Sequence, residues 1–589
     1  MAPVPADPGA REGGDGVVHA PRRLILACAL LVALAAPGAA WGHAALLKTF
    51  PAASAEVNTP PPQVRLTYSE AVEPRFAIVS VTNAAAGQQV DGAVRRSATN
   101  PNQLVVPLKR VPEGWYLVFW RVISVDGHPV RGAFTFKVGP NPGPPPRFVV
   151  PSLSETATTP NLLAARWITF LSIMAAVGLF VLRIAIARPV VSRVAGTRLR
   201  AVSIAFWIAL AVALVATPIY VLVATAEFAL RSVWSIGDLV PLMRVSSFGR
   251  GYLDIEFALG LFALAAAAAL WLDRPERAVR SVAALLALLG ALMAAAAALL
   301  GPAAAGHAAQ TSPRCLALGV DWVHVGAGSL WIGGLIGLLV LWRSLEVGKR
   351  VAGLLVCVPR FSTVALASVI AIWATGITAS VLHLPTVSSL WSTSYGHAIL
   401  WKVGILFIAM TLGAVNKLRS IPGLAATGDG SVRASRLLRR LVGVEVLLVA
   451  SAIFAAAVLS SLPPPPKALA GLGKVAATVG PGRVVSVVSQ NGYRVELRVT
   501  PNRAAVDNAF GVRITKDGKA VTGADVTQTF AMLDMEMPSQ SYRLPERSPG
   551  LYVKSTPALV MVGRWGLTFE IAPPGKAPFD VVLVDRANG

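Results

Sequence analysis

The chain has 589 residues, of which 54% are hydrophobic and only 14% are charged, and its mean hydropathy is +0.61. This composition is typical of an integral membrane protein and excludes an ordinary water-soluble globular protein. The formal net charge is +23. Membrane proteins accumulate Lys and Arg in their cytoplasmic loops, so this charge does not require a nucleic-acid partner, and we expect none.

Residues 1–42 predict a secretory signal peptide. A pair of arginines precedes a short apolar run over 24–36, and small residues stand at Ala40 and Gly42. A positive start, a short apolar centre and small residues before the cut are the features of a cleaved signal. An uncleaved anchor helix is the alternative, although the apolar run is short for a span. Cleavage makes His43 the first residue of the mature protein.

Residues 43–140 change character and predict a small all-β barrel or sandwich. Short segments of β-branched and aromatic residues alternate with Pro, Asn and Gly turn signals, as in compact β domains. The expected strands are 64–68, 76–81, 103–108, 114–125 and 132–138.

Asp126 and His128 are separated by one residue at the end of the strand expected over 114–125. Alternate residues of an extended chain face the same side, so this carboxylate and this imidazole point together. A mature chain that begins at His43 adds an amine and a second imidazole. Such a set of nitrogens with one oxygen suits Cu(II) better than Zn(II). The alternative is an Asp-Gly turn followed by an ordinary surface histidine.

This region resembles the CopC family of periplasmic copper-binding β-barrels. The matching stretches are His43-Ala44, Pro51-Ala52, 69–73 (SEAVE) and 120–132 (WRVISVDGHPVRG). The resemblance implies that His43, Asp126 and His128 are the Cu(II) ligands. Residues 43–150 hold no methionine, so we expect the methionine-rich Cu(I) site of some family members to be absent.

A proline-rich linker, 141–161, leads into a block of apolar segments over 162–462. Eight segments are close to the roughly 20 apolar residues that are needed to cross a bilayer. They lie at 162–186, 200–226, 252–272, 279–301, 316–342, 361–383, 397–417 and 439–461. We therefore expect an eight-helix transmembrane bundle.

Lys and Arg are distributed unequally between the loops of this block. Eighteen lie in the loops that follow the first, third, fifth and seventh segments or at the segment ends beside these loops, and four lie in the loops on the other side. Positive residues are retained on the cytoplasmic side of membrane proteins. We therefore expect a multi-pass protein of the cytoplasmic membrane with both soluble domains on the extracytoplasmic side, as the signal peptide also requires.

Four histidines of the block fall in its outer half: His307 after the fourth segment, His324 in the fifth, His383 at the end of the sixth and His397 at the start of the seventh. Asp321 shares a helix face with His324, because side chains three residues apart are neighbours on a helix. Ionisable groups inside a span are costly and usually functional. We assign these five residues as candidate ligands of a membrane copper path. Interfacial histidines without a ligand are the alternative.

Two further charges lie inside expected spans. Lys402 lies in the outer half of the seventh segment, where it could pair with Asp321. Glu445 lies nearer the cytoplasm in the eighth segment, where its side chain could extend towards the headgroups.

The block resembles the CopD family, the membrane partner of CopC. The matching residues are Gly306-His307-Ala308, 321–324 (DWVH), 331–335 (WIGGL), Tyr395-Gly396, Lys402 and Asn416. The order CopC then CopD in one chain strengthens both resemblances. Together they imply copper handling by the membrane block and movement of copper towards the cytoplasm.

Residues 463–589 predict a second extracytoplasmic all-β sandwich, with strands expected at 484–488, 493–499, 510–514, 551–553, 565–571 and 579–584. The region resembles the YtkA-like family through 535–538 (MEMP), 550–552 (GLY) and 561–565 (MVGRW). The thioethers of Met535 and Met537, with Met532 and Met561, are candidate Cu(I) ligands. The alternative is that these methionines fill the core.

Three functions are compatible with these features. The first, which we favour, is copper binding with copper import across the cytoplasmic membrane: the outer domain captures Cu(II), and imidazole or thioether ligands in the membrane suit Cu(I). The second is a non-transporting copper buffer, or a chaperone for a copper-requiring partner protein. The third is a membrane enzyme whose outer histidines hold haem or a catalytic metal, although the sequence has no c-type haem motif. We expect no enzyme, and we expect copper ions and the lipid bilayer as partners.

Overall fold

The computed structural model describes residues 44, 46–53, 55–83, 85–124, 129–143, 159–245, 247–277, 279–311, 313–426, 428–462, 464–465, 467–504, 506–534, 539–560 and 562–588. The expected signal segment lies outside these residues, as does most of the proline-rich linker. So do the candidate ligands His43, Asp126, His128, Met535 and Met537, together with Met561.

The amino-terminal domain is a sandwich of two four-stranded sheets, in agreement with the predicted all-β fold. One sheet has the order β1-β3-β6-β5 and the other the order β2-β8-β7-β4. The strands are β1 (Leu46–Phe50), β2 (Glu56–Val57), β3 (Gln63–Tyr68), β4 (Ile78–Asn83), β5 (Arg95–Arg96), β6 (Gln103–Pro107), β7 (Gly114–Ile123) and β8 (Pro129–Val138). Buried and less buried residues alternate along β3 and β6, so one face of their sheet packs inward. Tyr68 and Trp120 meet edge to face in the core, with ring centroids 5.5 Å apart.

The strand expected over 76–81 begins later than predicted. A single turn, η1 (Pro74–Phe76), takes its first position, and β4 starts at Ile78. Pro74 has the backbone angle of a turn, and the Glu73 carboxylate accepts a hydrogen bond from the N–H of Arg75 at 3.4 Å. Phe76 is therefore not part of the sheet.

Within the described residues, eight helices are long and apolar enough to cross a membrane, as the sequence predicted. The elements of the block are α2 (Pro160–Val181), η2 (Leu182–Ile186), α3 (Arg188–Arg193), α4 (Arg200–Ala229), α5 (Ile236–Val245), α6 (Ser247–Leu272), α7 (Val282–Ala304), η3 (His307–Gln310), α8 (Arg314–Ser344), η4 (Val347–Lys349), α9 (Arg350–His383), α10 (Ser389–Ser392), α11 (Ser394–Val415), η5 (Asn416–Ser420), α12 (Ile421–Leu424) and α13 (Asp429–Leu459). Two of these elements, η2 and η5, are single turns of π-helix that continue α2 and α11.

The spanning helices form two packed groups. α2, α4, α6 and α7 share one buried cluster, and α8, α9, α11 and α13 share another with the region that follows α2. The groups meet where α2 crosses α8 at two glycines, because a Cβ atom built at Gly333 would overlap the backbone of Gly178. Small residues allow helix backbones in membranes to approach this closely.

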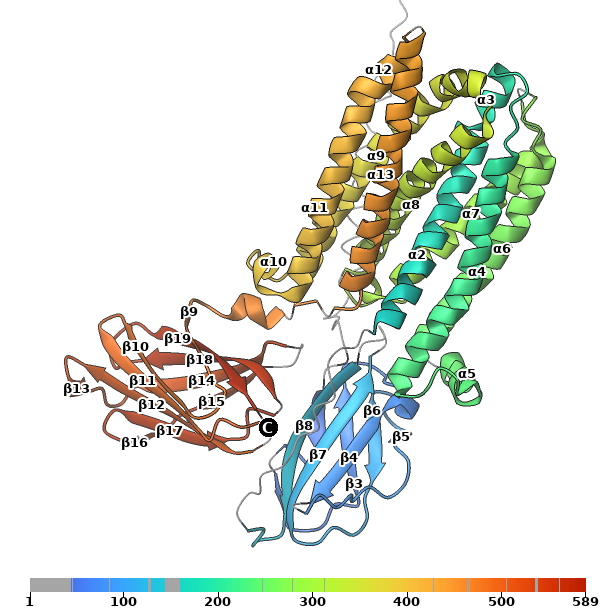
Figure 1. The fold of residues 1–589 in the computed structure, drawn as a ribbon. Coiled ribbons are helices and arrows are strands. Elements are labelled where there is room, and N and C mark those ends of the chain that lie inside the picture. Colours follow the sequence, from blue (N-terminus) through green and yellow to red (C-terminus); the bar gives the residue numbers. More distant parts are fainter. Residues whose placement is uncertain are drawn as a thin grey trace, which may run out of the picture.

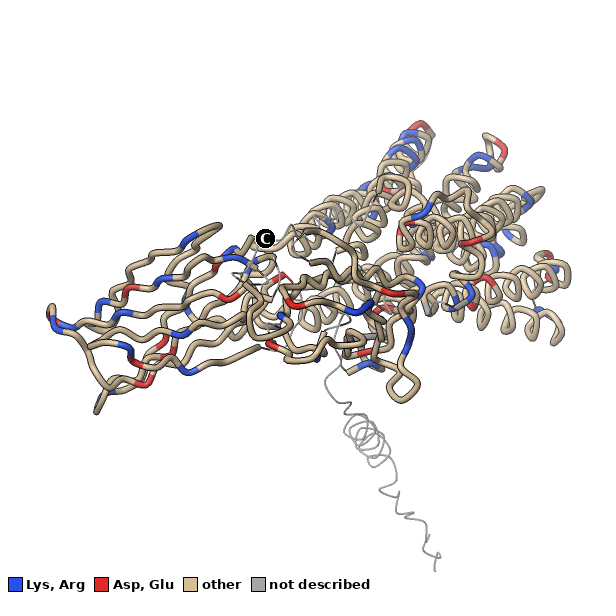
Figure 2. The backbone as a smooth tube through the Cα atoms, turned by 90° about the horizontal axis from the view of Figure 1, so that it is seen from below, with Lys and Arg blue, Asp and Glu red and all other residues tan. Residues whose placement is uncertain are grey.

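Both β domains lie at one end of the helical block, which we call the outer end (Figure 1). Figure 2 shows many of the Lys and Arg residues at the opposite, inner ends of the helices. There, the buried carboxylate of Asp273 forms ion pairs with Arg183 at 2.9 Å, Arg188 at 3.2 Å and Arg280 at 3.3 Å. Burial alone would raise the pKa of Asp273, but these guanidinium groups outweigh it and lower that pKa.

The amino-terminal domain is docked on the outer end of α4. Phe76 and Ile123 belong to the same buried cluster as Phe228 of α4. The Arg121 guanidinium, which is 7% exposed, donates from Nη1 to the carbonyl oxygen of Phe228 at 3.0 Å. Burial, and then the charge of Arg131, lower the pKa of Arg121 from its usual value. The end of β7 therefore has a defined position on the membrane block.

The carboxyl-terminal domain is a second sandwich, as predicted. Its sheets have the orders β10-β11-β12-β17-β16, with β13 paired to β12, and β15-β14-β18-β19-β9. After a short helix, η6 (Lys467–Gly471), the strands are β9 (Val475–Val479), β10 (Val484–Gln490), β11 (Tyr493–Thr500), β12 (Asn508–Lys516), β13 (Lys519–Ala520), β14 (Asp525–Met532), β15 (Gln540–Arg543), β16 (Glu546–Ser548), β17 (Leu551–Thr556), β18 (Gly563–Ala572) and β19 (Phe579–Ala587). The sequence did not predict β14, because a fully buried Gln528 interrupts its apolar alternation.

We expect Gly333→Ala to destabilise the helical block by roughly 1–3 kcal/mol, because the added methyl group meets backbone rather than a flexible side chain. Gly326→Ala on the same helix is the matched control, since a Cβ atom there has nothing within 4 Å. The unfolding temperature of the purified protein in detergent measures both variants. Equal temperatures would contradict the close crossing of α2 and α8.

We expect Arg121→Leu to loosen the amino-terminal domain from the membrane block. The Phe228 carbonyl loses its donor, and a hydrogen bond from a charged group contributes about 1.5–3 kcal/mol. Hydrogen exchange should increase at the end of α4 and in η1, while the sheets keep their protection. Arg95→Leu is the control, because Arg95 is exposed on β5 of the other sheet. Unchanged exchange in Arg121→Leu would show that other contacts hold the domain.

Candidate functional site

The described neighbours of the three candidate Cu(II) ligands lie together in the amino-terminal domain. Ala44, which follows His43, is 1% exposed and donates its backbone N–H to Ser124 Oγ at 3.0 Å. Ser124, two residues before Asp126, donates in turn to Glu70 Oε1 at 2.5 Å. One serine therefore links the start of the described chain to the end of β7. Because Ile123 packs on the helices, this link lies on the docked side of the domain.

His324 is at the centre of a polar cluster inside the bundle. It lies ten residues, or about 15 Å, from the outer end of α8. Its Nδ1 is 2.8 Å from Thr375 Oγ1, and this hydroxyl is 2.6 Å from the carbonyl oxygen of Ala371. The hydroxyl has one proton, which it donates to the carbonyl, so Oγ1 accepts from Nδ1–H. The lone pair of the neutral imidazole is therefore on Nε2.

Lys402 of α11 occupies that lone pair. Its Nζ lies 3.2 Å from His324 Nε2, and an ammonium group can only donate. The sequence suggested Asp321 as the partner of Lys402. The direct contact of Lys402 is instead with His324, whereas Asp321 contributes an electrostatic attraction.

His383 lies on the outer side of the same cluster. Its Nδ1 is 2.7 Å from the Ala379 carbonyl oxygen, so Nδ1 carries the proton and Nε2 the lone pair. Nε2 is 3.2 Å from the hydroxyl of Thr311, which follows η3. The ring stacks beside Tyr395 of α11, with centroids 6.4 Å apart.

Asp321 connects the two histidine sites through its charge. It interacts electrostatically with His383 and Lys402, and with Tyr395. The structure therefore brings together three of the five residues that the sequence singled out, Asp321, His324 and His383.

The two other predicted histidines are placed differently. His397 is exposed on α11, and its Nε2 donates to the carbonyl oxygen of Trp391 at 2.8 Å, so its described contact is with α10. His307 begins η3, which packs against α8 and ends just before Thr311. Its backbone therefore lies at the outer mouth of the cluster.

A second polar group lies deeper in the membrane block. Glu445 is 3% exposed, and its Oε1 accepts from Asn416 Nδ2 at 2.6 Å. Asn416 Oδ1 accepts from Ser420 Oγ at 3.0 Å. The sequence suggested that Glu445 extends towards the headgroups, but the structure buries it against α11. Asn416 and Ser420 bound the π-helical turn η5, and such turns are frequent at functional sites.

Met410 is a residue that the sequence analysis missed. It lies on α11, eight residues after Lys402, so these two positions are on the same side of the helix. Its Sδ accepts from Trp373 Nε1 of α9 at 2.8 Å. The helical spacing from Lys402 was visible in the sequence, but methionine is also a common core residue.

Arg166 was missed as well, although a charge in the first apolar segment is a recognisable signal. Arg166 is 7% exposed, and its Nε donates to Tyr220 Oη at 2.9 Å. Its Nη1 donates to the Ala457 carbonyl oxygen at 3.2 Å. Arg166 therefore ties α2 to α4 and α13.

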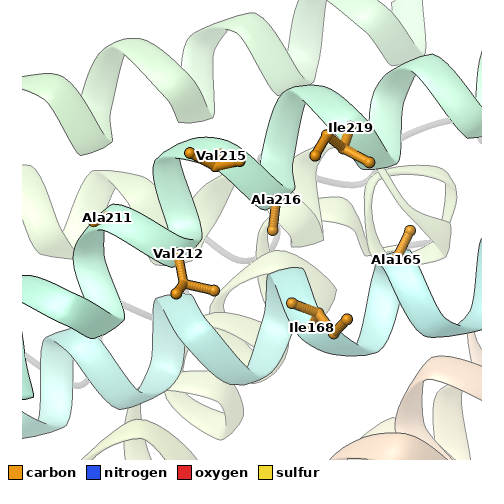
Figure 3. A pocket seen from close by; sticks show the side chains of 7 residues that line it. All are labelled: Ala165, Ile168, Ala211, Val212, Val215, Ala216 and Ile219. Carbon is orange, nitrogen blue, oxygen red and sulfur yellow. The ribbon is translucent and has the colours of Figure 1, made fainter.

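An open groove of about 450 Å³ between α2 and α4, lined in part by the exposed side chains of Ile168 and Val215, does not belong to the polar cluster. Only apolar side chains line it, namely Ala165 and Ile168 of α2 and Ala211, Val212, Val215, Ala216 and Ile219 of α4 (Figure 3). An ion finds no ligand there, so we place no copper path through it.

The described residues contain no group of three or more His, Cys, Asp or Glu side chains arranged to hold a metal ion. The membrane cluster instead contains two imidazoles: His324 Nε2 is 3.2 Å from Lys402 Nζ, and His383 Nε2 is 3.2 Å from Thr311 Oγ1. In the carboxyl-terminal domain, Met532 is 3% exposed within the core cluster, so it fills the core.

Three family models match the chain in order: CopC domain at residues 46–139, Copper resistance protein D at 356–459 and YtkA-like at 488–570. The chain is 26% identical to the copper transport protein CutJ of Bacillus subtilis (strain 168) over 552 residues, which are 91% of this chain and 94% of that protein. It is 36% identical to protein YobA of Escherichia coli (strain K12) over 118 residues, which are 20% of this chain and 95% of that protein. The crystal structure of CopC from Methylosinus trichosporium OB3b is 29% identical, with 18% of this chain and 100% of that chain covered and a TM-score of 0.16.

The chain therefore belongs to the family of copper resistance and copper transport proteins in which a CopC domain, a CopD membrane block and a YtkA-like domain follow one another.

Proposed function

We propose that the chain binds copper on the extracytoplasmic side of the cytoplasmic membrane and transports it inward. The cluster of Asp321, His324 and His383 carries this proposal, because ionisable groups inside an apolar bundle are costly and mark the pathways of ions. The relative CutJ, which aligns with nearly the whole chain, is named a copper transport protein.

The amino-terminal domain captures Cu(II) in this proposal. His43, Asp126 and His128 supply the amine, two imidazoles and a carboxylate, a set that suits Cu(II). The hydrogen bond from Ala44 to Ser124 supports this assignment, because it joins the neighbours of these ligands. Docking through Arg121 supports delivery to the bundle, because the domain stays at the end where His383 lies.

Copper then passes to Nε2 of His383 and His324 as Cu(I), with His307 and His397 nearer the surface. Reduction consumes one electron per ion, which an extracytoplasmic thiol or quinol supplies as it is oxidised. Met410 continues the path inward, because a thioether suits Cu(I). Met535 and Met537 are further candidate Cu(I) ligands, in the carboxyl-terminal domain.

The orientation of the protein in the membrane is part of the proposal. Both β domains share the outer end of the bundle, and basic residues gather at the inner ends (Figures 1 and 2). The positive-inside rule then assigns the inner end to the cytoplasm.

We expect His324→Ala to reduce copper uptake by about 10-fold or more, because the path loses its buried ligand. Uptake into cells that carry equal amounts of inserted protein measures this effect. Thr378→Ala on α9 is the control, since Thr378 is exposed and its hydroxyl donates to Ala374 of its own helix at 2.9 Å.

Equal uptake by His324→Ala and the wild type would remove His324 from the path. Wild-type protein that binds copper but imports none would favour the alternative function, a copper buffer or a chaperone for a copper-requiring protein.

One residue added before His43 of the mature chain should weaken Cu(II) binding about 10-fold or more, because the amine loses its place beside the imidazole. One residue added at the carboxyl end is the control. Competition with a coloured chelator measures the affinity, which should also fall in acid, where the amine and imidazoles bind protons. Undiminished affinity in the extended protein would show that the ligand set is different.

A further inference from the structure

Lys402 has an unusual position for a buried ammonium group. It donates to a neutral imidazole nitrogen at 3.2 Å rather than to a carboxylate, and the imidazole is oriented for this contact. Thr375 fixes the His324 tautomer that leaves the lone pair on Nε2. His324 Nε2, a nitrogen suited to bind a metal ion, therefore accepts a hydrogen bond from Lys402, a cation of the protein itself.

Lys402 reaches across to α8 with a long side chain. α11 packs closely against α13, whereas it reaches α8 and α9 through long side chains, Lys402 to His324 and Met410 to Trp373. A flexible side chain with four methylene groups therefore forms the contact. Asp321 lies one turn before His324 on the same face of α8, and its charge already attracts Lys402.

We infer that the Lys402 ammonium group occupies His324 Nε2 when no copper is bound, and that an entering copper ion displaces it from this nitrogen. This inference rests on the proposed function of His324 as a copper ligand. The ammonium keeps its protons and moves towards Asp321, so the imidazole exchanges a hydrogen bond for a metal–nitrogen bond. One Cu(I) enters the cluster, and one positive charge leaves the imidazole for the carboxylate.

The exchange also selects among cations. Na⁺, K⁺ and Mg²⁺ prefer oxygen ligands, so an imidazole nitrogen does not compensate them for displacing the ammonium group. Cu(I) binds imidazole nitrogen strongly enough to take its place. Lys402 therefore prevents the abundant cations from binding at His324, whereas soft transition-metal ions displace it.

Ag(I) is the probe for this inference, because it resembles Cu(I) and avoids redox chemistry. Binding to the full-length protein in detergent is compared for the wild type, Lys402→Leu, Lys402→Arg, His324→Ala and the Lys402→Leu/His324→Ala double variant. Leucine is chosen over methionine because a thioether would bind Ag(I) itself. Lys349→Leu is the control for loss of a lysine, since Lys349 is partly exposed at the inner end beside Glu346.

We expect Lys402→Leu to bind Ag(I) at His324 about 10- to 100-fold more tightly than the wild type, because no charged donor competes for the Nε2 lone pair. Lys402→Arg should stay near the wild type, and the gain should vanish in the double variant. If Lys402→Leu binds Ag(I) no more tightly than the wild type while His324→Ala still binds it more weakly, the inferred role of Lys402 is overturned and the proposed site at His324 stands. Wild-type binding by His324→Ala would overturn the proposed membrane site itself.

A measurement on the wild type tests the same exchange if Lys402→Leu does not fold. In protein labelled with ¹⁵N at His and Lys, Ag(I) should shift the His324 Nε2 and Lys402 Nζ resonances together, at the same metal concentration. A Lys402 resonance that stays unchanged while His324 binds Ag(I) would overturn the inference.

Discussion

The cost of burying an ammonium group in an apolar bundle constrains this membrane block more than any other single feature. Lys402 is far from water, so its charge needs partners inside the protein. The imidazole of His324 accepts its hydrogen bond, and the carboxylate of Asp321 attracts it. Thr375 in turn holds the imidazole in the required tautomer. Residues of α8, α9 and α11 are therefore kept in one arrangement because a single charge has to be satisfied.

The amino-terminal domain is attached at the same end of the bundle as the outer side of this cluster. Arg121 and Phe76 hold the amino-terminal sandwich against the end of α4, at the same end of the bundle as His383. Ser124, at the end of β7, accepts the hydrogen bond from Ala44. The end of β7 and the polar cluster around His383 therefore lie at the same end of the bundle.

The buried polar residues of the bundle fall into two groups that differ in their partners. Asp273 with its three arginines and Arg166 with Tyr220 have complete sets of partners and tie helices together. His324 Nε2, by contrast, contacts the long side chain of Lys402. Deeper in the block, Met410 of α11 accepts a hydrogen bond from Trp373, and Glu445 of α13 accepts one from Asn416. The buried polar residues of the bundle therefore differ in the kind of partner that they contact.

Composition, hydrophobic periodicity and loop charge were enough to determine eight spans between two β domains, because segment length and alternation are local properties of the chain. They also singled out Asp321 with His324, since a helical repeat places them on one face. Only the tertiary structure decided that Lys402 contacts His324 rather than Asp321, that Glu445 turns towards Asn416, and that His397 points to α10. The local turn at Pro74 takes Phe76 out of its expected strand, but only the tertiary structure shows that Phe76 then packs against α4. Contacts between separate helices depend on packing and side-chain reach, which no local pattern encodes.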